Sequence, residues 1–130
     1  MQQNYGHPKI HSDLIELYRR FFAVHRNMSK YLRIALLERE ILEAISNAMR
    51  LTIEINITRP EGGEEMSEMK RKIKILRALI ENIKVFTTLL WQLKALSEGF
   101  FIDAMATIEG ISKQIIGWER FLTQKHMPKI

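Results

Sequence analysis

The sequence lacks cysteine, and its 130 residues include only three prolines and six glycines. Without cysteine there is no disulfide framework, no thiolate nucleophile and no zinc site built from thiolates. No apolar run approaches the roughly 18 residues that span a bilayer, and the N-terminus lacks the basic-then-apolar pattern of a signal peptide. We therefore expect a cytoplasmic, soluble protein with one domain, which at this length buries a core without cross-links.

Catalytic and metal-binding motifs are also missing. The sequence has no HExxH pattern, no phosphate-binding loop and no Ser/His/Asp arrangement. His7 and His11 are four residues apart, but Pro8 argues against a helix that would direct both toward one metal ion. We therefore expect no cofactor, no metal and no catalytic site.

One pattern keeps an enzymatic alternative open. Arg20 is followed by His25, and Arg120 by His126, at a spacing that resembles the active motif of HEPN ribonucleases, which are also helical bundles. Those motifs usually place a polar residue after the arginine, whereas phenylalanine stands there in both places in this chain. We therefore favour a structural role for His25 and keep the ribonuclease as the alternative.

Capping and turn residues divide the chain into four helical segments. Ser12, Ser29 and Ser97 can each cap a helix, and residues 59–63 form the strongest turn signal. Along the segments, apolar residues recur mostly at steps of three and four, which places one stripe of each helix in a common core. The positions of this seam are Leu14, Leu17, Phe21, Val24, Met28, Ile34, Leu37, Ile41, Ile45, Ala48, Thr52, Ile55, Met69, Ile73, Leu76, Ile80, Ile83, Thr87, Leu90, Phe101, Ala104, Ile108, Ile111, Ile115, Trp118 and Leu122.

This period predicts an all-α protein, an antiparallel up-down-up-down four-helix bundle. The bundle domain covers residues 12–124, after a flexible lead-in of residues 1–11 and before a C-terminal tail of residues 125–130. Residues 52–58 also alternate between apolar and polar as a strand does. Because the seam continues through Ile55, we expect mostly helix there.

Two features point to self-association. The segment of residues 70–96 has an apolar arc wider than one seam requires. In the fourth helix, Ala106, Gly110 and Gly117 form a strip of small residues that lets a neighbouring backbone approach. We expect a ring-like homo-oligomer from these features, and the alternative is a helix embedded more deeply in one bundle. The additional apolar residues are Ile75, Leu79, Phe86, Leu89, Leu93 and Leu96.

The same segment of residues 70–96 holds seven basic residues and one acid, Glu81, although the whole chain has a net charge of only +5. Four of these cations share one face with only Glu81 among them, so we expect them to repel each other rather than pair. They are Lys70, Lys74, Arg77 and Lys84. This segregated charge predicts contact with a polyanion, and the alternative is an ordinary solvated face.

A second basic cluster surrounds the turn between the first two helices. Its members are Arg19, Arg20, Arg26, Lys30 and Arg33, with no acid among them. Clusters of this kind bind phosphates with an affinity that falls steeply as salt rises. Few exposed aromatic residues are expected beside either cluster, so we predict contact with a nucleic-acid backbone rather than with bases.

Three stretches resemble a known family. They are residues 30–36 at the start of the second helix, residues 83–97 toward the end of the third, and residues 111–118 in the fourth. From Ser29 to Trp118 the chain resembles the Avd-like accessory proteins of diversity-generating retroelements. Their helical relatives include four-helix-bundle proteins encoded within ribosomal RNA intervening sequences.

The resemblance implies a homopentamer of four-helix protomers without catalytic activity. It further implies binding to the retroelement reverse transcriptase and to template RNA or DNA, away from any membrane, in support of mutagenic reverse transcription. The basic residues that match by position are Lys30, Arg33, Lys84, Lys94 and Lys113; the sequence itself adds Arg26, Lys70, Lys74 and Arg77. A HEPN-like ribonuclease and a ribosomal-RNA-associated four-helix-bundle protein remain the alternatives.

Overall fold

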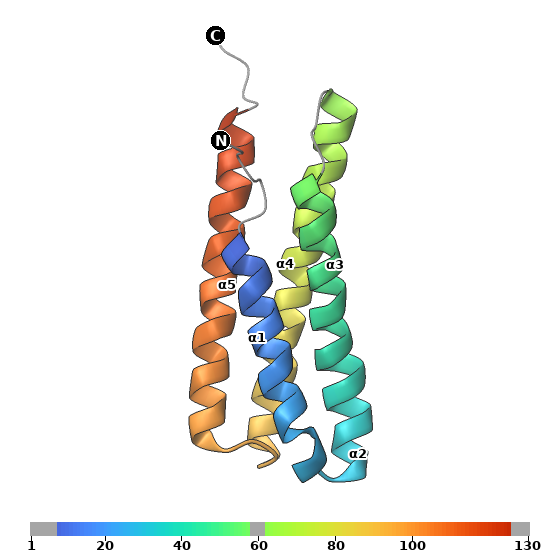
Figure 1. Cartoon of the computed structure of the whole chain (residues 1–130), viewed down its shortest axis with the longest axis vertical. Coiled ribbons are helices and arrows are strands. Elements are labelled where there is room, and N and C mark those ends of the chain that lie inside the picture. Colours follow the sequence, from blue (N-terminus) through green and yellow to red (C-terminus); the bar gives the residue numbers. More distant parts are fainter. Residues whose placement is uncertain (1–7, 58–61, 126–130) are drawn as a thin grey trace.

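The computed structural model of the chain describes residues 8–57 and 62–125, and all of its regular elements there are helices (Figure 1). The prediction of an all-α protein is therefore confirmed for the described residues. The elements are α1 (Pro8–Val24), the 3₁₀ turn η1 (His25–Asn27), α2 (Lys30–Leu32), the π-helix η2 (Arg33–Leu42), α3 (Glu43–Ile57), α4 (Gly63–Gln92) and α5 (Glu98–Lys125). None of the described helices is both long enough and apolar enough to cross a membrane.

Four long helical segments lie along the long axis of the molecule, since α2, η2 and α3 follow one another as one segment (Figure 1). α1 and α4 each contact both α3 and α5. The turn after α1 and the turn after α4 lie at the same end, because Phe21 near the end of α1 meets Phe100 at the start of α5, with ring centroids 5.2 Å apart. We call this end, formed by residues 25–30 and 93–97, the turn end.

The seam predicted from the sequence forms the core. Its residues on α4, from Met69 to Leu90, are all buried, and so are most of those on α1, α3 and α5. Two buried threonines satisfy their hydroxyls within their own helices: Thr52 Oγ1 donates to the Met49 carbonyl and Thr87 Oγ1 to the Ile83 carbonyl. Burial of these two hydroxyls therefore costs little.

The seam departs from the prediction in η2, where the hydrogen bonds run from each residue to the fifth one before it. The Glu43 amide, for example, donates to the Glu38 carbonyl. Leu37, Ile41 and Ile45 follow one another at two successive steps of four residues. On an ordinary α-helix, side chains at this spacing move progressively around the helix and away from the face that meets the core. The wider turn offsets this drift and keeps all three fully buried. Ile34 is 38% exposed instead, so its predicted place in the seam is wrong.

Two helix ends also differ from the prediction. α1 begins at Pro8 rather than at Ser12, because proline suits the first helical position, and Ile10 joins the core. The predicted lead-in is therefore wrong from Pro8 onward, while residues 1–7 lie outside the described residues. α3 remains helical through Ile57, so the strand-like alternation does not produce a strand. Ser29 and Ser97 act as caps as predicted, accepting hydrogen bonds from the amides of Leu32 and Phe100.

Candidate nucleic-acid interface

Three of the candidate residues lie at the turn end. Arg26 lies in η1, Lys30 begins α2, and Lys94 lies in the turn between α4 and α5. All three side chains are exposed, and none forms an ion pair with any residue in the described part of the chain. Arg33 stands apart from them, since it is half-buried and its Nε lies 4.0 Å from Glu38 Oε2. The turn end therefore presents three exposed cations that form no ion pair within the described residues.

Lys94 is held at the turn end by an unusual backbone. Its φ is 63°, in the left-handed region where glycine normally ends a helix. The Lys94 amide donates to the Trp91 carbonyl and the Ala95 amide to the Leu90 carbonyl, both at 2.9 Å. This pair of bonds is a Schellman motif, and a side chain in this conformation costs about 1 kcal/mol. α4 thus ends at Gln92, four residues earlier than the sequence predicted.

The basic face of α4 has a different environment. We call Lys70, Arg71, Lys72, Lys74, Arg77 and Lys84 the α4 strip. Lys72 Nζ lies 3.1 Å from Glu54 Oε1 on α3, and Arg77 Nη1 lies 3.0 Å from Glu119 Oε1 on α5. The expectation that these cations repel each other without pairing is therefore wrong for part of the strip, because the acids come from neighbouring helices.

Two more members of the α4 strip have acidic partners. Lys84 Nζ lies 2.5 Å from Glu109 Oε1 on α5, and Arg71 Nη2 lies 2.5 Å from Glu68 Oε1. The hydrogen bond from Lys84 lowers the pKa of Glu109, and the charge of Lys113 lowers it further. The carboxylate in turn raises the pKa of Lys84. The structure thus brings the candidates Lys84 and Lys113 together around one acid.

Arg71 and Glu68 affect each other in the same way. Their hydrogen bond lowers the pKa of Glu68 and raises that of Arg71. Lys70 and Lys74 are exposed, and neither has an ion-pair partner among the residues that the structure describes. Of the four cations predicted to be unpaired, Lys70 and Lys74 therefore have no ion-pair partner among the described residues, whereas Arg77 and Lys84 are paired.

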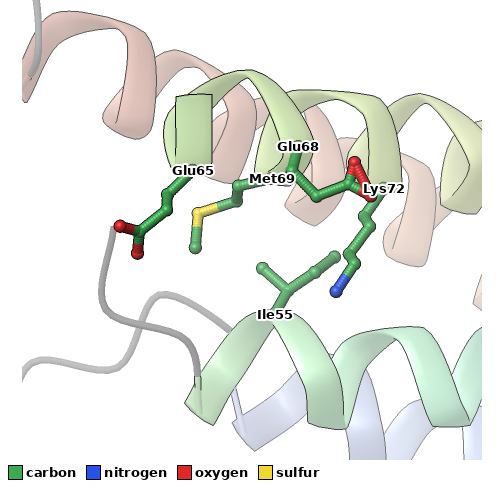
Figure 2. Close-up of a pocket in the computed structure, with 5 residues that line it drawn as sticks. All are labelled: Ile55, Glu65, Glu68, Met69 and Lys72. Atoms are coloured by element: carbon green, nitrogen blue, oxygen red, sulfur yellow. The ribbon is translucent and has the colours of Figure 1, made fainter. Parts of the chain in front are cut away.

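A small hollow lies where the start of α4 faces the end of α3. Figure 2 shows Met69 and Lys72 of α4 extending toward Ile55 of α3, while Glu65 lies at the edge of the hollow. Its volume is about 100 Å³. Ligand pockets usually reach at least roughly 300 Å³, so this hollow is too small to bind a nucleotide.

A larger groove runs between α1 and the helical segment of η2 and α3, with a volume of about 440 Å³. We call it the aromatic groove. On its α1 side, the rings of Tyr18 and Phe22 stack with centroids 6.4 Å apart, and those of Phe22 and His25 with centroids 5.5 Å apart. The groove is lined by Tyr18, Phe22, His25, Glu38, Leu42, Glu43, Ser46, Asn47 and Arg50.

The aromatic groove was not expected from the sequence, which predicted few exposed aromatic residues near the basic clusters. Phe22 is 59% exposed. The available signal was the placement of Tyr18, Phe22 and His25 at steps of four and three, which puts them on one face of a helix beside the seam. Because Phe21 alone fits the seam, its neighbour Phe22 had to face outward.

His25 lies in this groove, with its Nε2 2.5 Å from Glu38 Oε2. Arg20, its partner in the ribonuclease-like spacing, instead donates from Nε to Glu16 Oε2 at 3.3 Å and does not line the groove. His126 lies outside the described residues. Arg20 and His25 are therefore held by different carboxylates, Glu16 and Glu38.

The other histidine candidate for a metal site has a structural contact. His11 Nδ1 lies 3.3 Å from Thr52 Oγ1, while His7 lies outside the described residues. No group of three possible metal ligands occurs in residues 8–57 and 62–125.

A scan of protein-family models finds none that matches this chain, and a search of curated proteins finds no significant match either. The interpretation of the surface consequently depends on the residues themselves and on the resemblance drawn from the sequence.

Proposed function

We propose that this chain is a non-catalytic accessory protein of a diversity-generating retroelement, which binds the element's reverse transcriptase and its template RNA. Its protomer is an antiparallel four-helix bundle, and five protomers form a ring. In this role the protein holds nucleic acid for mutagenic reverse transcription. The proposal is supported by the resemblance over Ser29 to Trp118 and by the charge distribution of the surface.

The observation that carries the proposal is the trio of Arg26, Lys30 and Lys94 at the turn end. Each is exposed, and none forms an ion pair within the described part of the chain. Unpaired cations release counterions when they meet phosphates, which is the main source of affinity for nucleic-acid backbones. Lys30 and Lys94 also match the family resemblance by position.

The binding claim is tested by titrating purified protein into labelled single-stranded RNA at several salt concentrations. We expect the logarithm of the affinity to fall linearly with the logarithm of the salt concentration. The slope should be about −0.7 for each phosphate contact. An affinity that does not change with salt would contradict the electrostatic argument. Co-purification with a reverse transcriptase encoded beside this gene tests the second partner.

The ring is supported by surfaces of α4 and α5 that the protomer does not cover. A Cβ atom added at Gly110 or Gly117 would meet nothing within 4 Å, and Val85 on α4 is exposed. Light scattering should give a mass five times the 15.3 kDa of one chain. A monomer in solution would refute the ring.

One hydrogen bond, between His25 and Glu38, favours the ribonuclease alternative. His25 is held by the Glu38 carboxylate, and a histidine held in this way can transfer protons. The test is incubation of RNA with the protein in the absence of metal ions. Cleavage that is lost in His25→Ala would overturn the non-catalytic proposal, and intact RNA would remove the alternative.

A further inference from the structure

We propose that the aromatic groove binds one unpaired base of a single-stranded nucleic acid while the adjoining phosphates lie on the turn end. This inference deepens the proposed function, on which it rests, by adding recognition of a base to recognition of the backbone. It reverses the sequence-based expectation that bases are not contacted.

The α1 wall of the groove carries exposed aromatic surface. Phe22 leaves 59% of its surface to solvent, and its ring lies within 17° of the planes of both Tyr18 and His25. Single-stranded nucleic acids are bound by stacking bases on exposed aromatic side chains, and Phe22 is such a side chain. The groove volume of about 440 Å³ falls within the usual range of ligand pockets.

The opposite wall of the groove carries polar side chains. Ser46, Asn47 and Arg50 of α3 line it, and Arg50 Nη1 donates to Asn47 Oδ1 at 2.5 Å. This bond fixes the Asn47 amide and leaves its two N–H groups and most of the Arg50 donors for a ligand. The α3 wall thus offers hydrogen-bond donors across the groove from the aromatic rings.

Charge is divided between the groove and the turn end. The groove holds two carboxylates, Glu38 and Glu43, against the single guanidinium of Arg50, so a phosphate would be repelled from it while a neutral base would not. His25 lines the groove, and the next residue in the chain is Arg26 of the turn end. We therefore expect the base to lie in the groove and its phosphate to contact Arg26 and Lys30.

The wall opposite α1 is formed partly by the π-helix η2. Glu38 and Leu42 belong to η2, ten residues of π-helix. Such segments are rare, usually short, and frequently located at functional sites. The widened turns also place Glu38 where it can bind His25 and fix the ring that ends the stack.

The test compares two ligands of equal charge, a short oligoadenylate and the same ribose-phosphate chain without bases. We expect the protein to bind oligoadenylate about tenfold more tightly, since stacking one base contributes on that order. Phe22→Ala should remove this preference, and Phe22→Trp should retain it. Ile102→Ala is the matched control, because Ile102 is 58% exposed and lies on α5 outside the groove.

The outcomes separate this inference from the proposed function. If both ligands bind equally well and with strong salt dependence, the groove proposal is overturned and the backbone-binding function stands. If neither ligand binds, both the groove proposal and the proposed nucleic-acid-binding function are refuted. A preference for oligoadenylate that survives in Phe22→Ala would also overturn the groove, provided that the variant keeps the helical circular dichroism of the wild type.

Discussion

The α4 strip and the turn end both gather cations, but their surroundings differ. On the α4 strip, Lys72, Arg77 and Lys84 each lie within 3.1 Å of a carboxylate from a neighbouring helix. At the turn end, Arg26 and Lys94 have no such partner within residues 8–57 and 62–125. A high density of basic residues along the sequence is therefore a poor guide to the positive potential of the surface.

The difference has a geometric cause. α4 contacts both α3 and α5, so acids on those helices can reach three of its cations. Turns at one end have fewer neighbouring side chains. The same number of cations therefore attracts a polyanion more strongly at the turn end than on the α4 strip.

The largest expected effect comes from neutralising the turn end. Arg26→Gln, Lys30→Gln and Lys94→Gln together should lower the affinity for single-stranded RNA by more than about tenfold and reduce the salt slope by about 2 units. The reason is that three unpaired phosphate contacts are lost. Fluorescence anisotropy at several salt concentrations measures both quantities.

The matched control removes the same charge from the α4 strip through Lys72→Gln, Arg77→Gln and Lys84→Gln. We expect a smaller loss of affinity and little change in salt slope, since these cations already have acidic partners. Equal losses in the two triple variants would show that the ion pairs do not shield the strip.

A single position at the turn end should separate stability from binding. Lys94→Gly relieves the left-handed backbone at φ 63° and should raise the free energy of unfolding by about 1 kcal/mol. It should also weaken RNA binding several-fold, because the ammonium group is lost. Urea denaturation and anisotropy give the two readouts.

Lys94→Ala serves as the control, since it removes the charge but keeps a Cβ in the strained conformation. It should weaken binding as much as Lys94→Gly does, without the gain in stability. If Lys94→Gly binds RNA as well as the wild type does, the strain at this position has no link to nucleic-acid binding.

The seam could be predicted because it depends on spacing within one helix. Met69, Ile73 and Leu76 are buried as expected, since a residue's face on a regular helix follows from its number. The same reasoning failed at Ile34, where η2 changes the number of residues per turn. The sequence did indicate this change, because Leu37, Ile41 and Ile45 are spaced by two successive steps of four residues.

The charge pairs and the groove could not be predicted in this way. The partner of Arg77 is 42 residues away, and the partner of Glu38 is 13 residues away across a turn. Rules for side-chain pairs three or four residues apart in one helix do not predict these contacts. They depend on the rotation and offset of neighbouring helices, which the sequence pattern leaves open.

The energy of one pairing on the α4 strip can be measured directly. A double-mutant cycle with Arg77→Ala and Glu119→Ala should give a coupling of about 0.5 kcal/mol, as for other exposed pairs at this distance. The coupling should shrink at high salt. A coupling of zero would mean that Arg77 is as available to a polyanion as Arg26 is.

The smallest effect is a pH dependence at Glu109, whose pKa is lowered from its ordinary value of 4.5 by the hydrogen bond with Lys84. A carboxylate with a lowered pKa stabilises the folded state above its unfolded pKa, and this contribution is lost as the pH falls through the folded pKa. The wild type should therefore lose slightly more stability than Lys84→Gln on acidification below pH 4.5. Circular dichroism in urea at each pH measures this difference.

Protonation of Glu109 should make the α4 strip more similar to the turn end in its number of unpaired cations. When Glu109 takes up a proton, Lys84 loses its ionised partner and becomes an unpaired cation like Lys94. Neutralising Lys84 should then weaken binding to oligouridylate more at acidic pH than at neutral pH, whereas neutralising Lys94 should have the same effect at both. A pH-independent effect of Lys84→Gln would mean that Glu109 does not shield Lys84, and the contrast between the regions would need another cause.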